Sequence, residues 1–324
     1  MTTTTSAPAT PLTGGVRRIL LDGAGIPISA LLAEPGQEYG HGQEYGHGLG
    51  PERAPGAPGE RAAPRATVVA LHGGGMSAGY FHGQAQPGLS LLTLGARLGF
   101  TVLSLDRPGY GESTARLPHG QTLTEQSDTL RAALADFAGR HATGAGLFLL
   151  AHSYGGKLAL TAAARDTGAA GAPLLGLDVS GCGQEYAVGP DDLPGSRGHG
   201  HWTRNWGALR LYPPGTFAAS GALVAPMPER ERAEALRWPG MFPEVAARVR
   251  VPVRLTFAEY ESWWRHDEAA LARLTGRFTA APRLLVERLP DAGHNISLGL
   301  TARTYHLRAL AFLEECLATL RPEV

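Results

Sequence analysis

One serine stands where large apolar residues give way abruptly to small ones. Residues 147 to 156 read Leu-Phe-Leu-Leu-Ala-His-Ser-Tyr-Gly-Gly, which places Ser153 between Ala151 and Gly155. A strand that turns sharply into a helix leaves no room for large side chains two positions before and after the turning residue, and these residues meet that need. Such a turn lifts the hydroxyl above the sheet, at a helix N-terminus whose N–H groups face developing negative charge. The pattern therefore predicts that Ser153 is a nucleophile.

The elements that would position this serine alternate between strands and helices. Residues 16–33 alternate loosely around a turn signal, Asp22-Gly23, which predicts an N-terminal hairpin. The later pattern predicts strands at 67–71, 101–105, 147–151, 174–179, 251–257 and 282–286, and helices at 91–98, 122–141, 154–165 and 302–320. Repeated strand–helix units predict a mostly parallel sheet.

Three motifs follow the early strands in a fixed order. His-Gly-Gly-Gly occupies 72–75, Asp-Arg-Pro-Gly-Tyr-Gly-Glu-Ser occupies 106–113, and Ala-His-Ser-Tyr-Gly at 151–155 forms the turn around the serine. Together they resemble the α/β-hydrolase superfamily over nearly the whole chain. Alanine at the first position of the third motif departs from G-x-S-x-G, but it is small enough for the turn. The resemblance implies an α/β-hydrolase fold, with a mostly parallel central sheet flanked by helices and an inserted cap.

The same resemblance implies a base and an acid for the serine, which attacks at neutral pH only when a base takes its proton. His294, after the last expected strand, stands where the superfamily has its histidine. The superfamily pattern G-x-x-D falls on Ala-Glu-Tyr-Glu at 258–261, so Glu261 is the closest match for the acid. Glu259 and Asp291 are alternatives, because the longer glutamate side chain changes where its backbone must lie. The order serine, acid, histidine is that of the superfamily.

Backbone N–H groups are expected to bind the negative oxygen that forms during attack. The superfamily pattern assigns this role to Tyr154, directly after the serine, and to Gly74 or Gly75. No phosphate-binding glycine motif is present, so this loop predicts no nucleotide site. His72 and His152 flank the site, and we expect them to orient or pack near the substrate rather than to act as a second base.

The composition along the chain predicts four segments. Residues 1–15 are expected to be a disordered tail, and 16–181 the first part of the hydrolase core. Within that part, 35–64 is rich in Gly and Pro and carries a tandem Gly-Gln-Glu-Tyr-Gly-His repeat, which predicts a mobile loop. The alternation fails over 182–249, which we interpret as the cap, and 250–324 completes the core.

All five tryptophans fall between positions 202 and 264. Aromatic residues dominate any small core, so packing within the cap is one explanation. The other is a substrate pocket, because such pockets are lined mainly by apolar and aromatic side chains. Under the second explanation the expected substrate-binding residues include Trp202, Trp206, Trp238 and Trp263.

The overall composition favours a small molecule as partner. Lys and Arg total 29 against 29 Asp and Glu, so no net charge favours nucleic acid or an anionic membrane. Lys157 is the only lysine. The two cysteines indicate neither a disulfide framework nor a metal cluster, and we expect no metal and no cofactor. The N-terminus lacks the charged and apolar regions of a signal peptide, which predicts a cytoplasmic location. The sequence does not determine the oligomeric state.

These observations predict a serine-dependent hydrolase that cleaves an ester or thioester through an acyl-enzyme on Ser153. The alternative is elimination, because the segment 71–83 resembles hydrolase-like enzymes of actinobacterial natural-product pathways, some of which eliminate acetate from an acetylated tetronate. A binding protein without catalysis is a third class, since one fold hosts many functions. The presence of serine, histidine and an acid candidate argues against that class.

Overall fold

The computed structural model of the chain describes most of the hydrolase core and part of the predicted cap. The described residues are 15–36, 63–168, 170–193, 201–220 and 223–320. The predicted tail at 1–15 and the predicted loop at 35–64 lie almost entirely outside these ranges.

Eight strands form one sheet in the order β1-β2-β4-β3-β5-β6-β7-β8. The first two pair antiparallel with each other, and β2 pairs antiparallel with β4, whereas all the later pairings are parallel. This arrangement confirms the predicted mostly parallel sheet and the N-terminal hairpin. The strands are β1 (Arg17–Asp22), β2 (Pro27–Ala33), β3 (Thr67–Leu71), β4 (Thr101–Leu105), β5 (Leu147–His152), β6 (Leu174–Ser180), β7 (Val253–Tyr260) and β8 (Leu284–Gly293).

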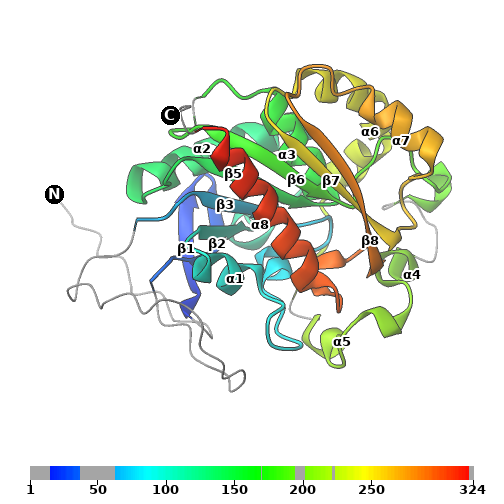
Figure 1. The fold of residues 1–324 in the computed structure, drawn as a ribbon, viewed down its shortest axis with the longest axis horizontal. Helices are drawn as coiled ribbons and strands as arrows, with labels where there is room; N and C mark the ends of the chain where they lie inside the picture. The colour runs from blue at the N-terminus through cyan, green and yellow to red at the C-terminus, as the bar shows by residue number, and fades with distance from the viewer. Residues whose placement is uncertain (1–14, 37–62, 169, 194–200, 221–222, 321–324) are drawn as a thin grey trace.

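Helices cover both faces of the sheet (Figure 1). On one face lie α1 (Leu91–Arg97) and α8 (Ala302–Ala318), and on the other lie α2 (Leu123–Arg140), α3 (Tyr154–Ala164) and α6 (Glu229–Arg248). A short helix that the sequence pattern did not predict, α7 (Glu268–Thr275), connects β7 to β8. Among the described helices none is both long and apolar enough to cross a bilayer.

The central strands are buried on both faces, which explains their continuous apolar runs. In β3, Val69 and Leu71 face the cluster that includes α2, α3 and α6, while Val68 and Ala70 face the cluster under α1 and α8. Successive side chains of a strand point to opposite faces, so each central strand contributes to both cores.

The segment predicted as the cap contains two kinds of structure. Short helices α4 (His201–Trp206) and α5 (Thr216–Ser220) follow β6 and lie beyond the end of β8 in Figure 1. The long α6 instead packs against α3, and its buried face recurs every three or four residues at Ala235, Trp238, Phe242 and Ala246. The range 182–249 therefore includes a helix of the core layer as well as the short helices over the sheet end.

The connection from β5 to α3 is a strained turn at Ser153. Its φ of 51° and ψ of −115° are values that residues with a side chain seldom adopt. Gly155 lets the turn pack against the neighbouring strand, because a Cβ there would lie 2.2 Å from the carbonyl oxygen of Leu71. This turn holds the start of α3 directly over the carboxyl end of the sheet.

Replacing Gly155 with alanine should therefore destabilise the protein, since the new methyl group would meet backbone that cannot move aside. We expect a loss of about 3 kcal/mol or more in the free energy of unfolding, measured by urea denaturation. Gly139→Ala is the matched control, because Gly139 lies in α2 with nothing within 4 Å of an added Cβ. That control should be neutral or should stabilise by about 0.5 to 1 kcal/mol. Equal effects of the two substitutions would contradict this account of the turn.

Candidate active site

Three side chains from the carboxyl ends of three strands form one hydrogen-bonded chain. Ser153 follows β5, Glu261 follows β7 and His294 follows β8. The serine Oγ lies 3.1 Å from Nε2 of His294, and Nδ1 of that ring lies 2.8 and 3.1 Å from the two carboxylate oxygens of Glu261. In the tautomer that fits these contacts, Nδ1–H donates to the carboxylate and Nε2 accepts from the serine hydroxyl.

The Glu261 carboxylate is buried but remains ionised. Burial by itself would raise the pKa of Glu261, yet the contact with His294 and the backbone N–H of Trp263, which donates to Oε1 at 2.9 Å, outweigh it. The net effect is a pKa below the ordinary value for glutamate. At neutral pH the carboxylate is therefore charged and able to hold the imidazole in one orientation.

The two alternative acids lie away from the histidine ring. Glu259 is exposed and accepts a hydrogen bond from the backbone N–H of Asp291 at 2.8 Å. Asp291 is itself exposed, with a left-handed φ of 52° at the bend near the end of β8. Their contacts position the β7 and β8 ends, and Glu261 alone of the three carboxylates contacts His294.

The two flanking histidines, His72 and His152, were expected to orient or pack near the substrate; they pack beneath the site, and neither lines the cavity, so a substrate-binding role for them is not supported. His72 is fully buried, with Nδ1–H donating to the Gly73 carbonyl at 2.8 Å and Nε2 accepting from the backbone N–H of Arg107 at 3.0 Å. His152 is 1 % exposed, stacks on Tyr80 with ring centroids 4.8 Å apart, and contacts the Ser180 hydroxyl at 3.1 Å. Burial is the main cause that holds the pKa of each ring well below 6.5.

The glycine loop after β3 passes close to the serine. A Cβ at Gly73 would lie 3.1 Å from the His152 ring and 3.2 Å from Cβ of Ser153, so a larger residue there would crowd both neighbours. Of the two glycines expected as alternative donors, Gly75 already donates its N–H to the Tyr110 hydroxyl at 3.0 Å. Gly74 is then the loop's candidate donor. The backbone N–H of Tyr154 lies in the first turn of α3, where N–H groups have no partner within the helix.

A buried ion pair fixes this loop. Arg107 and Glu231 are both fully buried and form two N–H to carboxylate contacts, at 2.5 and 3.1 Å. The same guanidinium donates to the carbonyl oxygens of His72 at 2.7 Å and Gly73 at 3.3 Å. The Tyr110 hydroxyl donates to the Glu231 carboxylate at 2.8 Å. The loop is therefore tied to α6, which begins just before Glu231.

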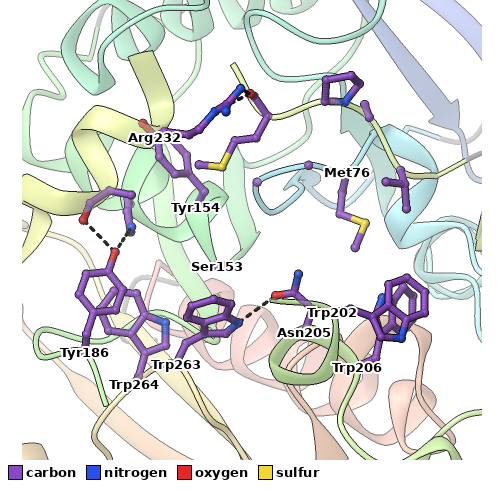
Figure 2. A pocket seen from close by; sticks show the side chains of 18 residues that line it. Met76, Ser153, Tyr154, Tyr186, Trp202, Asn205, Trp206, Arg232, Trp263 and Trp264 are labelled. Atoms are coloured by element: carbon purple, nitrogen blue, oxygen red, sulfur yellow. Dashed lines mark hydrogen bonds between the residues drawn. The ribbon is translucent and has the colours of Figure 1, made fainter. Parts of the chain in front are cut away.

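A cavity of about 380 Å³ borders the serine (Figure 2). Tyr186, Trp263 and Trp264 lie on one side of it, and Trp202 and Trp206 lie on the opposite side. Apolar side chains from the glycine loop and the segment before α6, Met76 and Val224 to Met227, complete much of the lining. The volume lies in the range of small-molecule sites.

Three of the four tryptophans expected at the pocket line it, and the fourth does not. Trp202, 55 % exposed, and Trp206 and Trp263, both buried, border the cavity. Trp238 instead lies in the core, with its indole N–H donating to the Gly183 carbonyl at 2.9 Å and its ring against Phe242. It belongs to the core cluster that α3 and α6 share.

Sequence reasoning gave no role to several lining residues, among them Lys157, Trp264 and Met227. For Lys157 a signal was available, because it lies about one turn into the helix that begins directly after Ser153. No comparable signal existed for Met227, which reaches the cavity from a segment distant in sequence.

The comparisons with known proteins agree with this architecture. Residues 68–304 match the model of the alpha/beta hydrolase family, and the chain belongs to that family. No curated protein sequence matches it.

Similar solved structures share the fold at low sequence identity. An N-acyl homoserine lactonase mutant complexed with N-hexanoyl homoserine has a TM-score of 0.61 at 13 % identity, covering 95 % of this chain and 99 % of that one. Est1E from Butyrivibrio proteoclasticus, with ferulic acid bound, has a TM-score of 0.55 at 14 % identity, covering 93 % and 99 %. A thermophilic esterase from Thermogutta terrifontis has a TM-score of 0.53 at 15 % identity, covering 94 % and 99 %. The family and these neighbours support hydrolase activity.

Substitution of the three carboxylates tests which of them serves the histidine. Glu261→Gln should lower kcat for ester hydrolysis by roughly 10³- to 10⁴-fold, because an amide can present N–H to Nδ1 and favours the wrong tautomer. Glu259→Gln and Asp291→Asn should stay within a few-fold of the wild type. A damaging Glu259 or Asp291 variant beside a nearly silent Glu261 variant would contradict the assignment.

Removal of the Tyr110 hydroxyl tests whether the glycine loop is positioned by this network. Tyr110→Phe should lower kcat by roughly tenfold with little change in KM, because Gly75 loses its acceptor and the loop keeps only its link to Glu231 through Arg107. The control is Tyr305→Phe, which removes another buried hydroxyl that donates to Asp178 inside the sheet at 2.8 Å. If both variants lose thermal stability while neither changes kcat, the network has no positioning role.

Proposed function

We propose that this protein is a serine-dependent acyl hydrolase that cleaves an ester or thioester of a small organic molecule. The observation that carries the proposal is the hydrogen-bonded chain Ser153–His294–Glu261 at a strained turn beside a mainly apolar cavity. A nucleophile, a base and an orienting acid in this order are the parts that acyl transfer needs. The small-molecule partner and the cytoplasmic location remain predictions from sequence.

Acylation would begin with His294 taking the proton of the Ser153 hydroxyl as Oγ bonds to the substrate carbonyl carbon. The carbonyl oxygen becomes negative, and the N–H groups of Gly74 and Tyr154 would stabilise it. Glu261 stabilises the imidazolium and keeps Nδ1 toward itself. The imidazolium then gives its proton to the departing alcohol or thiol as the tetrahedral intermediate collapses, which leaves the acyl group on the serine.

Deacylation would repeat these steps with water as the nucleophile. His294 takes a proton from water, hydroxide oxygen bonds to the acyl carbon, and the bond to Oγ breaks. The proton returns to Ser153 and the acid leaves. The new oxygen in the acid therefore comes from solvent.

Elimination predicts a different origin for that oxygen. An elimination needs only a base to remove a proton and a site for the departing carboxylate, which leaves with both of its original oxygens. Turnover in oxygen-18 water should therefore put label into the acid product if the protein hydrolyses esters. As a control, the unlabelled acid product is incubated in oxygen-18 water with the Ser153→Ala variant, which measures any exchange of label into the acid without turnover. An unlabelled acid formed together with a new carbon–carbon double bond would overturn the proposal in favour of a lyase.

A further inference from the structure

The charged groups around the cavity are all of one sign. Among the described residues that line it, the charged side chains are Lys157 and Arg232, and there is no aspartate or glutamate. Arg232 is exposed at the rim, where its guanidinium donates to the Met227 carbonyl at 2.9 and 3.2 Å. Lys157 is 3 % exposed. The cavity thus presents one buried and one exposed cation in an otherwise mainly apolar lining.

Lys157 is buried, and no carboxylate of the described residues forms an ion pair with it. Its ammonium donates to the Tyr186 hydroxyl at 2.7 Å. The carboxylates of Glu231 and Glu234 interact electrostatically with Lys157, but each forms an ion pair with another residue. Glu231 pairs with Arg107 at 2.5 Å, and Glu234 pairs with Arg237 at 3.6 Å. Burial is the main cause that lowers the pKa of Lys157 to about 8, so the group is still mostly charged at pH 7.

Aromatic rings around Lys157 offset part of the free-energy cost of burying its charge. The ammonium nitrogen lies 5.2 to 5.9 Å from the ring centroids of Tyr154, Tyr186, Trp238 and Trp264. Such contacts favour a cation, but they do not use its N–H donors. The ammonium has three N–H donors, and the Tyr186 hydroxyl accepts only one of them. The phenol itself needs no ammonium to hold it, because Tyr186 donates to the Ala235 carbonyl at 2.9 Å. An apolar side chain would fill this position at less cost, so the cation has a use that packing does not explain.

We propose that the cavity binds an ester whose body carries a carboxylate, and that this carboxylate pairs with Lys157. The inference rests on the proposed function and names its substrate class. Ser153 is the residue before the first turn of α3 and Lys157 lies about one helical turn further on, and both line the cavity. The carboxylate therefore lies within a few bonds of the carbonyl that the serine attacks. Arg232 at the rim attracts the same anion into the cavity, and Trp206, Trp263 and Trp264 contact its apolar body.

Binding to an inactive variant tests this pairing without depending on turnover. In the Ser153→Ala background, calorimetry compares 3-acetoxybenzoate with the neutral 3-acetoxybenzamide, which has the same shape. The carboxylate should bind at least about tenfold more tightly, which corresponds to about 1.4 kcal/mol. Adding Lys157→Met should remove that preference and leave the affinity for the amide within about twofold. Arg237→Gln is the control for the loss of one positive charge outside the cavity, because Arg237 is exposed on α6 and does not line the cavity, and it should leave the carboxylate preference unchanged.

Two results of the binding experiment would overturn the inference: equal binding of the two probes to the Ser153→Ala protein, or a carboxylate preference that survives in the Lys157→Met variant. Lys157→Gln is measured alongside, so that a folding defect of one substitution does not decide the result, and thermal unfolding checks both variants. The proposed function fails separately, if wild-type protein leaves phenyl acetate and 3-acetoxybenzoate intact. If the wild type hydrolyses phenyl acetate, and Lys157→Met lowers kcat/KM equally for phenyl acetate and 3-acetoxybenzoate, the proposed hydrolase function stands and the carboxylate specificity is wrong.

Discussion

The sharp turn at Ser153 is the constraint around which the site is arranged. Its left-handed φ of 51° is tolerated because Gly155 packs directly against the Leu71 carbonyl, so β3 and the start of α3 hold the turn from both sides. Because the turn ends a central parallel strand, the segments after β3, β7 and β8 meet at the same edge of the sheet. Side chains separated by up to 141 positions thereby come within hydrogen-bond distance.

A second constraint is the buried Arg107–Glu231 pair, which joins the glycine loop to α6. A buried ion pair contributes little net stability compared with apolar packing, but removal of one partner leaves an unpaired buried charge at a cost of about 3 to 5 kcal/mol. Here the pair also orients Tyr110 and the Gly73 carbonyl. The geometry of the glycine loop thus depends on a helix more than a hundred residues away in the chain.

The sequence predicted well what depends on local sterics and poorly what depends on the cap. The turn at Ser153 and the buried strands could be recognised because each is specified by a few consecutive residues. The helix α6 could not, because Pro239 and Pro243 stand inside it and proline usually ends a helix. Its apolar face against α3 outweighs that penalty, and this face is why Trp238 lies in the core and not in the pocket. The position of Lys157 one turn after Ser153 indicates that it lies near the site, but the cavity that it lines is completed by residues distant in sequence, such as Met227 and Trp206.

The central claim, that Ser153 is the nucleophile of an acyl-transfer reaction, is tested most directly by the turnover of Ser153→Ala on an ester that the wild type hydrolyses. We predict a loss in kcat on the order of 10⁴- to 10⁶-fold. Residues that act as one unit are strongly non-additive, so the double variant with His294→Ala should be about as slow as the worse single one. A Ser153→Ala protein that folds normally and keeps near wild-type turnover would contradict the account.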